Sequence, residues 1–192
     1  MLKKDIRIEF SKLRLRYNPS EMADFSEAIS KRFFANIELR EINSAHVFLP
    51  MIDKNEIDTR IIVNKLWNEF PHVQTITSKS DLKLITMESF LFNDQTHFED
   101  DEWGISTPVN AMAFQDDHID LILVPLLAFD KKGMRVGYGK AFYDKFLLNC
   151  KPDIIKVGLS ILDPVEEIED VGEHDIPLSC CITPTEFYDF RK

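Results

Sequence analysis

One short run, Ile119 to Val124, restricts the possible folds more than any other part of the chain. Five of its six residues are apolar, and Pro125 follows directly, so the run predicts a buried strand that ends at that proline. A polar, glycine-bearing loop comes next, and then a helical pattern. A mostly apolar strand followed by a helix is typical of parallel sheets, which are covered on both faces.

Helical and strand-like segments alternate along the rest of the chain. Apolar residues at three- and four-residue spacing predict helices over 2–17, 19–36, 58–70 and 140–149, the second of them capped by Asn18. Short β-rich runs predict strands at 45–50, 73–77, 82–87, 154–159 and 181–183. Such alternation implies parallel pairing through right-handed crossovers. We therefore expect an α/β fold, a three-layer, open, mostly parallel sheet with helices on both faces, Rossmann-like but not dinucleotide-binding.

The first predicted helix combines an apolar stripe with a basic surface. Its apolar residues fall on one face, which we expect to pack inward: Leu2, Ile6, Phe10 and Leu13. Its cations cover the remaining surface: Lys3, Lys4, Arg7, Lys12, Arg14 and Arg16. At 192 residues, the chain is expected to form a single domain over residues 1–192.

Charge and hydropathy argue against several classes of protein. The 23 Lys+Arg against 33 Asp+Glu give a net charge of −10, which disfavours a protein that wraps nucleic acid. No apolar run approaches the roughly 20 residues of a membrane span, and residues 1–5 lack the apolar core of a signal peptide. Cys150, Cys180 and Cys181 form no zinc pattern and are typical of reduced thiols. We expect a cytoplasmic monomer whose partners are small molecules, not nucleic acid or membrane.

Residues 124–145 hold the densest collection of chemical groups. Three of the six glycines lie here, at 133, 137 and 139, with five basic and two acidic residues: Lys131, Lys132, Arg135, Lys140, Lys145, Asp130 and Asp144. Glycine lets the backbone approach a ligand closely, and a strand, a glycine-rich turn and a helix N-terminus together make an anion site. Local positive charge in an acidic chain therefore indicates phosphate binding, although a flexible loop with solvated lysines would have the same composition.

The familiar fingerprints do not fit this loop. A P-loop has four residues between its glycines and Ser or Thr after its lysine, whereas five residues separate Gly133 from Gly139, and Ala141 follows Lys140. A dinucleotide motif would need a glycine where Phe142 stands. The chain has no GxSxG or HExxH motif, and its five histidines are scattered. A P-loop kinase and a Rossmann dehydrogenase are both poor matches.

The loop resembles the 5-formyltetrahydrofolate cyclo-ligase family, also called methenyltetrahydrofolate synthetases. The family's signature is a strand ended by proline, an aromatic–Asp pair, and then Gly-x-Arg-hydrophobic-Gly-x-Gly-x-Gly-aromatic-Tyr-Asp. This chain has Val124-Pro125, Phe129-Asp130 and, over residues 133–144, Gly-Met-Arg-Val-Gly-Tyr-Gly-Lys-Ala-Phe-Tyr-Asp. It departs at Tyr138, where the family often has arginine, and at Ala141, where the family often has glycine. We expect the extra methyl group of Ala141 to be tolerated at a helix start.

Segments far from the loop extend the resemblance. The family opens with a lysine followed four residues later by an arginine, as Lys3 and Arg7 do here, and this spacing brings both cations to one helix face. A strand end at 49–51 followed by Glu-Ile-Asp-Thr at 56–59 matches the family's folate-binding loop. Trp-Gly-Ile-Ser-Thr-Pro at 103–108 resembles its segment near the pterin. His-Asp at 174–175 resembles a turn whose aspartate is associated with magnesium.

The resemblance implies a role for each matching residue. The residues implied to bind ATP are Lys3, Lys4, Arg7, Gly133, Arg135, Val136, Gly137, Tyr138, Gly139, Lys140, Ala141, Phe142 and Tyr143. The residues implied to bind the folate are Leu49, Met51, Glu56, Trp103, Tyr138 and Phe142. The catalytic residues would be Arg135, Lys140 and Tyr143, and the ligands of Mg²⁺ would be Asp144 and Asp175, since carboxylates suit this hard cation.

The implied reaction is the ATP-dependent cyclisation of 5-formyltetrahydrofolate to 5,10-methenyltetrahydrofolate, with ATP and Mg²⁺ as cofactors and release of ADP and phosphate. It needs no protein nucleophile, in agreement with the lack of a Ser–His or Cys–His signature. Two alternatives remain at this point. A different phosphotransferase on a similar scaffold would need the phosphate loop but not Trp103 or Glu56. A non-catalytic nucleotide- or folate-binding module would fit the departures at Tyr138 and Ala141.

Overall fold

The computed structural model describes residues 1–81, 83–100 and 104–191. Its elements in chain order are α1 (Lys3–Arg14), α2 (Pro19–Asn36), β1 (Ser44–His46), the 3-10 turn η1 (Ile52–Lys54), α3 (Arg60–Glu69), β2 (Gln74–Asp81), β3 (Thr86–Phe92), β4 (Phe98–Asp100), β5 (Ser106–Pro108), β6 (Ala113–Phe114), η2 (Asp116–His118), β7 (Leu121–Pro125), β8 (Ala128–Phe129), β9 (Arg135–Val136), α4 (Phe142–Leu147), β10 (Ile155–Leu159), β11 (Cys180–Ile182) and β12 (Phe187–Asp189).

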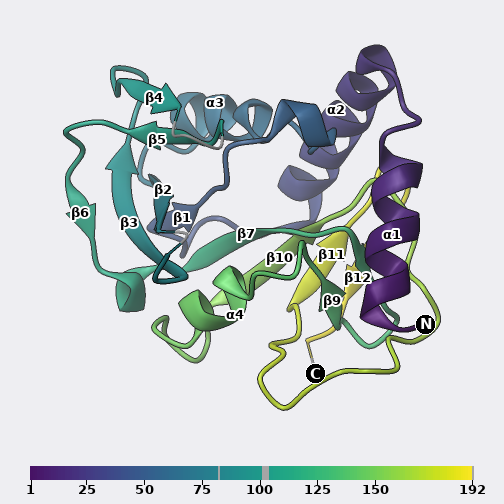
Figure 1. Cartoon of the computed structure of the whole chain (residues 1–192). Helices are drawn as coiled ribbons and strands as arrows, with labels where there is room; N and C mark the ends of the chain where they lie inside the picture. The colour runs from purple at the N-terminus through teal and green to yellow at the C-terminus, as the bar shows by residue number, and fades with distance from the viewer. Residues whose placement is uncertain (82, 101–103, 192) are drawn as a thin grey trace.

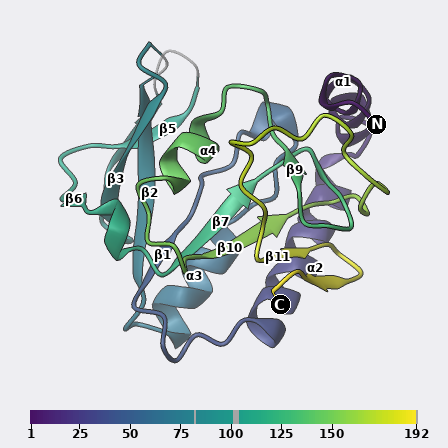
Figure 2. The ribbon, with the colours of Figure 1, turned by 90° about the horizontal axis from the view of Figure 1, so that it is seen from below.

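An eight-stranded sheet forms the centre, in the order β12-β11-β10-β7-β1-β2-β3-β6 (Figure 1). The five strands from β11 to β2 are parallel, whereas β12, β3 and β6 are antiparallel additions at the edges. Helices α2 and α3 lie on one face of the sheet and α4 lies on the other, as the view from below in Figure 2 makes clear. The predicted fold class is confirmed.

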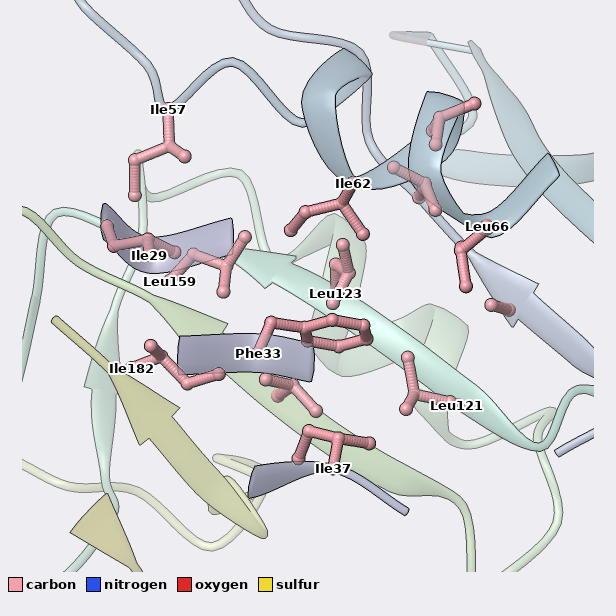
Figure 3. Close-up of a cluster of buried hydrophobic side chains, with 14 of the residues drawn as sticks. Ile29, Phe33, Ile37, Ile57, Ile62, Leu66, Leu121, Leu123, Leu159 and Ile182 are labelled. Atoms are coloured by element: carbon pink, nitrogen blue, oxygen red, sulfur yellow. The ribbon is translucent and has the colours of Figure 1, made fainter. Parts of the chain in front are cut away.

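Strand β7 is apolar because it is covered on both faces. Leu121 and Leu123 point toward α2 and α3, where they join Phe33 and Leu66 in the larger core (Figure 3). Ile122 and Val124 alternate to the other face and pack in the cluster that includes Phe146 and Leu147 of α4. Burial of one such side chain contributes about 1.5–3 kcal/mol. The apolar run at 119–124 therefore lies in the middle one of the three layers.

The strand pair predicted at 73–77 and 82–87 is partly wrong. Strand β2 continues to Asp81, and its partner β3 begins only at Thr86. The carboxylate of Asp81 accepts hydrogen bonds from the backbone N–H groups of Lys83 and Leu84, and Ile85 adopts a positive φ of 53°. This local aspartate turn overrides the strand propensity of Leu84 and Ile85, while Leu82, where the strand was predicted to begin, lies outside the described residues.

Several helix and strand ends, and one helix face, also differ from the prediction. Helix α4 begins at Phe142 rather than 140, because Ala141 takes a left-handed conformation. Strand β1 ends at His46 rather than 50, although Val47 still donates its N–H to Ile76. On α1 the predicted apolar face is incomplete, since Leu2 is exposed while Arg14, expected on the outside, is buried.

Candidate functional site

The glycine loop follows β7 at the carboxyl end of the parallel strands. Strands β8 and β9 form a hairpin, residues 137–141 cross to α4, and the loop thus lies where open α/β sheets bind ligands. Gly133 has a φ of +82°, and a Cβ there would lie 2.8 Å from the ring of Phe190. Gly139 has a φ of +90°, and a Cβ there would lie 3.1 Å from Nε of Arg7. Both positions therefore favour glycine for their conformation, and Gly133 also requires it for space.

The conformation of Ala141 differs from the regular helix start that we expected. It precedes α4 with φ 57° and ψ 19°, and its side chain makes no cap. A left-handed conformation costs an alanine about 1–2 kcal/mol, because its Cβ crowds the following carbonyl oxygen. The methyl group is thus accommodated with strain rather than at a regular helix start.

We predict that Ala141→Gly stabilises the protein. Relief of the strain outweighs the greater chain entropy of glycine in the unfolded state, about 0.4–1 kcal/mol, so the free energy of unfolding in urea should rise by up to about 1 kcal/mol. As a matched control, Ala23→Gly on the exposed surface of α2 should lower the free energy of unfolding by about 1 kcal/mol. Equal losses in the two variants would contradict the assigned strain.

Helix α1 docks beside β9 and brings two cations to the loop (Figure 1). Ile6 and Phe10 are buried against the cluster that contains Leu127, Val136 and Ile168. On the neighbouring surface of the helix, Arg7 donates from Nε to the carbonyl of Gly137 at 3.0 Å, and Lys3 forms an ion pair with Asp175. Residues 130 and more positions apart in the chain thus meet, because α1 crosses the ends of the central strands.

A second ion pair joins Arg135 to Asp144. Nη2 of Arg135 lies 2.8 Å from Oδ1 of Asp144, and Nη1 donates to the carbonyl of Ile176. The N–H of Ile176 in turn lies 3.3 Å from Oδ1 of Asp144, so the pair is tied to the chain directly after Asp175. The side chain of Arg135 is 6% exposed, which makes it a held cation rather than a mobile one.

The two carboxylates retain capacity for a further ligand. Burial alone would raise the pKa of Asp175, but hydrogen bonds from Lys3 and from the N–H of Gly172, with the charges of Lys3 and Arg135, outweigh it and lower the pKa. Within the described residues, Oδ1 of Asp175 and Oδ2 of Asp144 receive no hydrogen bond. Those same residues contain no group of three or more His, Cys, Asp or Glu side chains placed to hold a metal ion.

Glu56 lies on the far side of the loop and is nearly buried, at 7% exposure. Its Oε2 accepts from the N–H of Met51 at 2.9 Å, and its Oε1 accepts from the hydroxyl of Tyr138 at 2.8 Å. Burial raises the pKa of Glu56, while the Met51 and Tyr138 hydrogen bonds and the charge of Arg14 oppose that rise. Tyr138 thereby joins the glycine loop to the segment that was predicted to bind the folate.

Arg14 is the site residue that the sequence analysis missed. It donates from Nη1 to the hydroxyl of Tyr138 at 2.9 Å and from Nη2 to the carbonyl of Leu126 at 2.7 Å. Its spacing held a usable signal, because Arg7 and Arg14 stand seven residues apart, which is two helical turns on one face. We assigned Leu13 to the inward face of the helix, and that assignment placed Arg14 on the outside.

The remaining predicted residues divide by exposure. Lys4 and Lys140 are exposed, and neither forms an ion pair with any residue that the structure describes. Val136 is buried, and its carbonyl accepts from Leu127, so it supports the hairpin. Residues that are half-buried at the rim are Leu49, Met51, Phe142 and Tyr143. Burial, followed by the nearby charge of Glu56, raises the pKa of Tyr143. Trp103 lies outside the described residues.

Comparison with known proteins agrees with the motifs. A model of the 5-formyltetrahydrofolate cyclo-ligase family matches residues 1–184. The chain belongs to this family. It is 27% identical over 186 residues to the 5-formyltetrahydrofolate cyclo-ligase of Haemophilus influenzae, covering 92% of this chain and 94% of that protein. It is 26% identical over 158 residues to the one from Mus musculus, covering 77% and 74%. Membership confirms the expected enzyme class, a ligase of folate metabolism.

Two solved structures share the fold. The NMR structure of 5,10-methenyltetrahydrofolate synthetase from Aquifex aeolicus has a TM-score of 0.82 at 23% identity, covering 100% of this chain and 94% of that one. The structure of a synthetase of the same name from Mycoplasma pneumoniae has a TM-score of 0.72 at 18% identity, covering 95% and 98%. Among the helices described here, none has the length and apolar character that a membrane crossing requires.

Proposed function

We propose that this chain converts 5-formyltetrahydrofolate and ATP into 5,10-methenyltetrahydrofolate, ADP and phosphate. The observation that carries the proposal is the hydrogen bond between Tyr138 and Glu56. It connects a loop with the composition of a phosphate site to a buried carboxylate that suits the polar edge of a flat heterocycle. Two substrates bound on the two sides of Tyr138 would meet at the loop.

The phosphate side is assigned to the loop and to α1. The guanidinium of Arg7 lies over Gly139, and Lys140 is free in solvent, so both can reach a triphosphate held along residues 137–141. Arg135 and Lys3 are each neutralised by an aspartate. These ion pairs keep the charges compensated before ATP binds, and each cation can then share its charge with a phosphate oxygen.

The chemistry of the aspartates in those pairs suits magnesium. Mg²⁺ is usually bound by one or two carboxylates together with phosphate oxygens, and Asp144 and Asp175 each offer one oxygen without a hydrogen bond among the described residues. Asp144 and Asp175 would hold the ion, which when bound neutralises phosphate charge. The donor set is therefore suitable although it contains fewer than three acidic side chains.

In the proposed reaction the formyl oxygen attacks the γ-phosphorus of ATP and ADP leaves. The neighbouring nitrogen of the folate then adds to the activated formyl carbon, and the carbon–oxygen bond breaks. Phosphate leaves as the ring closes and takes up the proton that this nitrogen loses. The protein contributes position and charge rather than a nucleophile. Glu56 holds the folate, the loop and α1 hold the phosphates, and Arg135, Lys140 and Tyr143 surround the transferred group.

An absorbance assay tests the proposal. Purified protein with 5-formyltetrahydrofolate, ATP and Mg²⁺ should accumulate the methenyl product, and omission of ATP should abolish it. ATP hydrolysis that does not depend on the folate would instead support another phosphotransferase, and binding without turnover would support a non-catalytic module. Monomeric state and cytoplasmic location stay predictions, the first to be checked by analytical ultracentrifugation.

We predict that Arg7→Met weakens the use of ATP. Loss of a charge-assisted contact of about 1.5–3 kcal/mol should raise the KM for ATP about 10- to 100-fold and leave the KM for the folate nearly unchanged. Lys12→Met removes an exposed cation from the same helix and should leave both values unaltered. An unchanged KM for ATP in Arg7→Met would remove α1 from the nucleotide site.

A further inference from the structure

Arg14 is a buried cation that pairs with no carboxylate among the described residues. It is 4% exposed, and it forms no ion pair with any residue in the described part of the chain. An unpaired buried charge is costly unless neighbouring groups compensate it. The partners of Arg14 are neutral oxygens, the carbonyl of Leu126 and the hydroxyl of Tyr138. A charge kept at such a place therefore calls for a role beyond packing.

Tyr138 links this charge to Glu56. Its hydroxyl has one proton, which it donates to Oε1 of Glu56 at 2.8 Å, and it accepts the N–H of Arg14 at 2.9 Å. The direction of both hydrogen bonds is fixed, because a guanidinium only donates and a carboxylate only accepts. Arg14, Tyr138 and Glu56 thus form one polarised series of hydrogen bonds, in which each bond strengthens the next.

The same arginine also sits where three segments meet. The carbonyl of Arg14 accepts a hydrogen bond from Nδ2 of Asn55 at 3.1 Å, and that amide also reaches the carbonyl of Tyr17 at 2.8 Å. Asn55 takes a positive φ of 49° directly before Glu56. The end of α1 therefore holds the backbone before Glu56, while the side chain of Arg14 reaches its carboxylate through Tyr138.

We propose that Arg14 is a positioning residue for the folate, which acts through Tyr138 to orient the Glu56 carboxylate and to supply its positive counter-charge. The inference rests on the proposed function of Glu56 as the folate-binding carboxylate. It assigns the end of α1 to the folate side and its beginning, with Lys3 and Arg7, to the phosphate side. One helix would then span both substrates.

The pH profile separates this role from a purely structural one. The charged and titratable groups that face Glu56 are Arg14 from α1, Asp53 from η1, Tyr138 from the loop and Tyr143 from α4. Burial and the charge of Asp53 raise the pKa of Glu56, and Arg14 lowers it. Without Arg14, Glu56 should take up a proton at a higher pH, so the acid limb of kcat/KM for the folate should move to higher pH.

The test uses Arg14→Met, which keeps the length of the side chain, and Tyr138→Phe, which cuts the relay. Each should raise the KM for 5-formyltetrahydrofolate about 10- to 100-fold, and Arg14→Met should change the KM for ATP less than threefold. Because the two residues act through one series of hydrogen bonds, the KM for the folate in the double variant should be little higher than in the more severe single variant. Tyr138→Arg in the Arg14→Met background should restore folate binding, since it returns a guanidinium to Glu56. Arg16→Met, an exposed cation beyond the end of α1, is the control.

Calorimetric binding of 5-formyltetrahydrofolate without ATP makes the test independent of turnover. Weaker binding in Arg14→Met, with the acid limb of the folate binding constant moved to higher pH, supports the inference even if the wild type forms no methenyl product, a result that would contradict only the proposed reaction. Equal effects on folate and ATP, or an unmoved acid limb in a folded Arg14→Met protein, would overturn the inference. If Arg14→Met fails to fold by circular dichroism, Tyr138→Phe and Arg14→Lys decide by the same two measurements.

Discussion

Asp144→Asn should reduce turnover at least about 100-fold, the scale on which lost charge stabilisation in the transition state is measured. The substitution keeps the size of the side chain and an oxygen atom at its end. Oδ1 of Asp144 receives both of its hydrogen bonds, from Arg135 and from the N–H of Ile176. Asparagine keeps an oxygen for those donors, but it replaces Oδ2, the atom left for a cation, and it removes the negative charge that faces Arg135. The Mg²⁺ concentration that gives half-maximal rate should rise together with the loss of turnover.

The competing explanation for Asp144 is structural. An acid in the first turn of α4 is favoured by the helix dipole by about 0.3–1 kcal/mol. That role predicts a small loss of stability and near-normal activity in Asp144→Asn. Turnover measured against Mg²⁺ concentration, together with unfolding in urea, distinguishes the two. Near-normal turnover with an unchanged Mg²⁺ curve would leave Asp144 as only the partner of Arg135.

The variant Asp81→Asn is a useful comparison, since Asp81 also holds local backbone N–H groups and lies outside the proposed site. Its carboxylate fixes the turn between β2 and β3 through Lys83 and Leu84. It should keep wild-type turnover and the wild-type Mg²⁺ curve. A loss of turnover in Asp81→Asn equal to that in Asp144→Asn would indicate a general effect of removing an acidic side chain.

The parts of the site that could be predicted depend on the spacing of residues within one loop or one helix. Glycines at 133 and 139 were predicted from the local composition of the loop, whereas Lys3 and Arg7 were predicted from the resemblance to the family, and their four-residue spacing places both cations on one helix face. The central strand β7 was found because burial on both faces leaves an apolar run. In each case one element determines the pattern, so the sequence contains the necessary information.

The parts that escaped prediction depend on two elements meeting. Arg14 looked like one more surface cation, because its partner Tyr138 lies 124 positions away and the angle of α1 decides whether they touch. The pairing of Arg135 with Asp144 was equally hidden, since β9 and α4 must fold back across the loop to form it. The strain at Ala141 arises from that same crossing. Tertiary geometry, not local propensity, assigns these roles.

His46 gives the second large effect, a loss of stability in acid. It is fully buried on β1, where Nε2 shares a hydrogen bond with the hydroxyl of Ser78, while Nδ1 has no partner among the described residues. The rings of Phe146 and Tyr143 lie 5.1 and 6.3 Å from it, centre to centre. Burial lowers the pKa of His46 from 6.5 to about 3, although the polarity of its own backbone opposes this shift.

The sign follows from proton uptake by the two states. Between about pH 6.5 and about pH 3 the unfolded chain binds a proton at His46 and the folded protein does not. Acid therefore favours the unfolded state, and the contribution of His46 to the free energy of unfolding falls by about 1.4 kcal/mol for each pH unit below 6.5. Above that range the imidazole is neutral in both states, and its contribution is constant.

His46→Leu should remove this dependence. Measured by urea unfolding at pH 6.5 and pH 4.5, the stability of the wild type relative to the variant should fall by about 2–3 kcal/mol. Ser78→Ala is the matched control, because it removes the hydrogen-bond partner but leaves the imidazole buried, so it should keep the acid loss of the wild type. If the stability difference between the wild type and His46→Leu is equal at both pH values, the site around His46 admits the charged ring.

His46 lies against Phe146 and Tyr143 of α4, the helix that carries Asp144. The loss of stability in acid should therefore affect this helix, and turnover should fall together with stability over the same pH range.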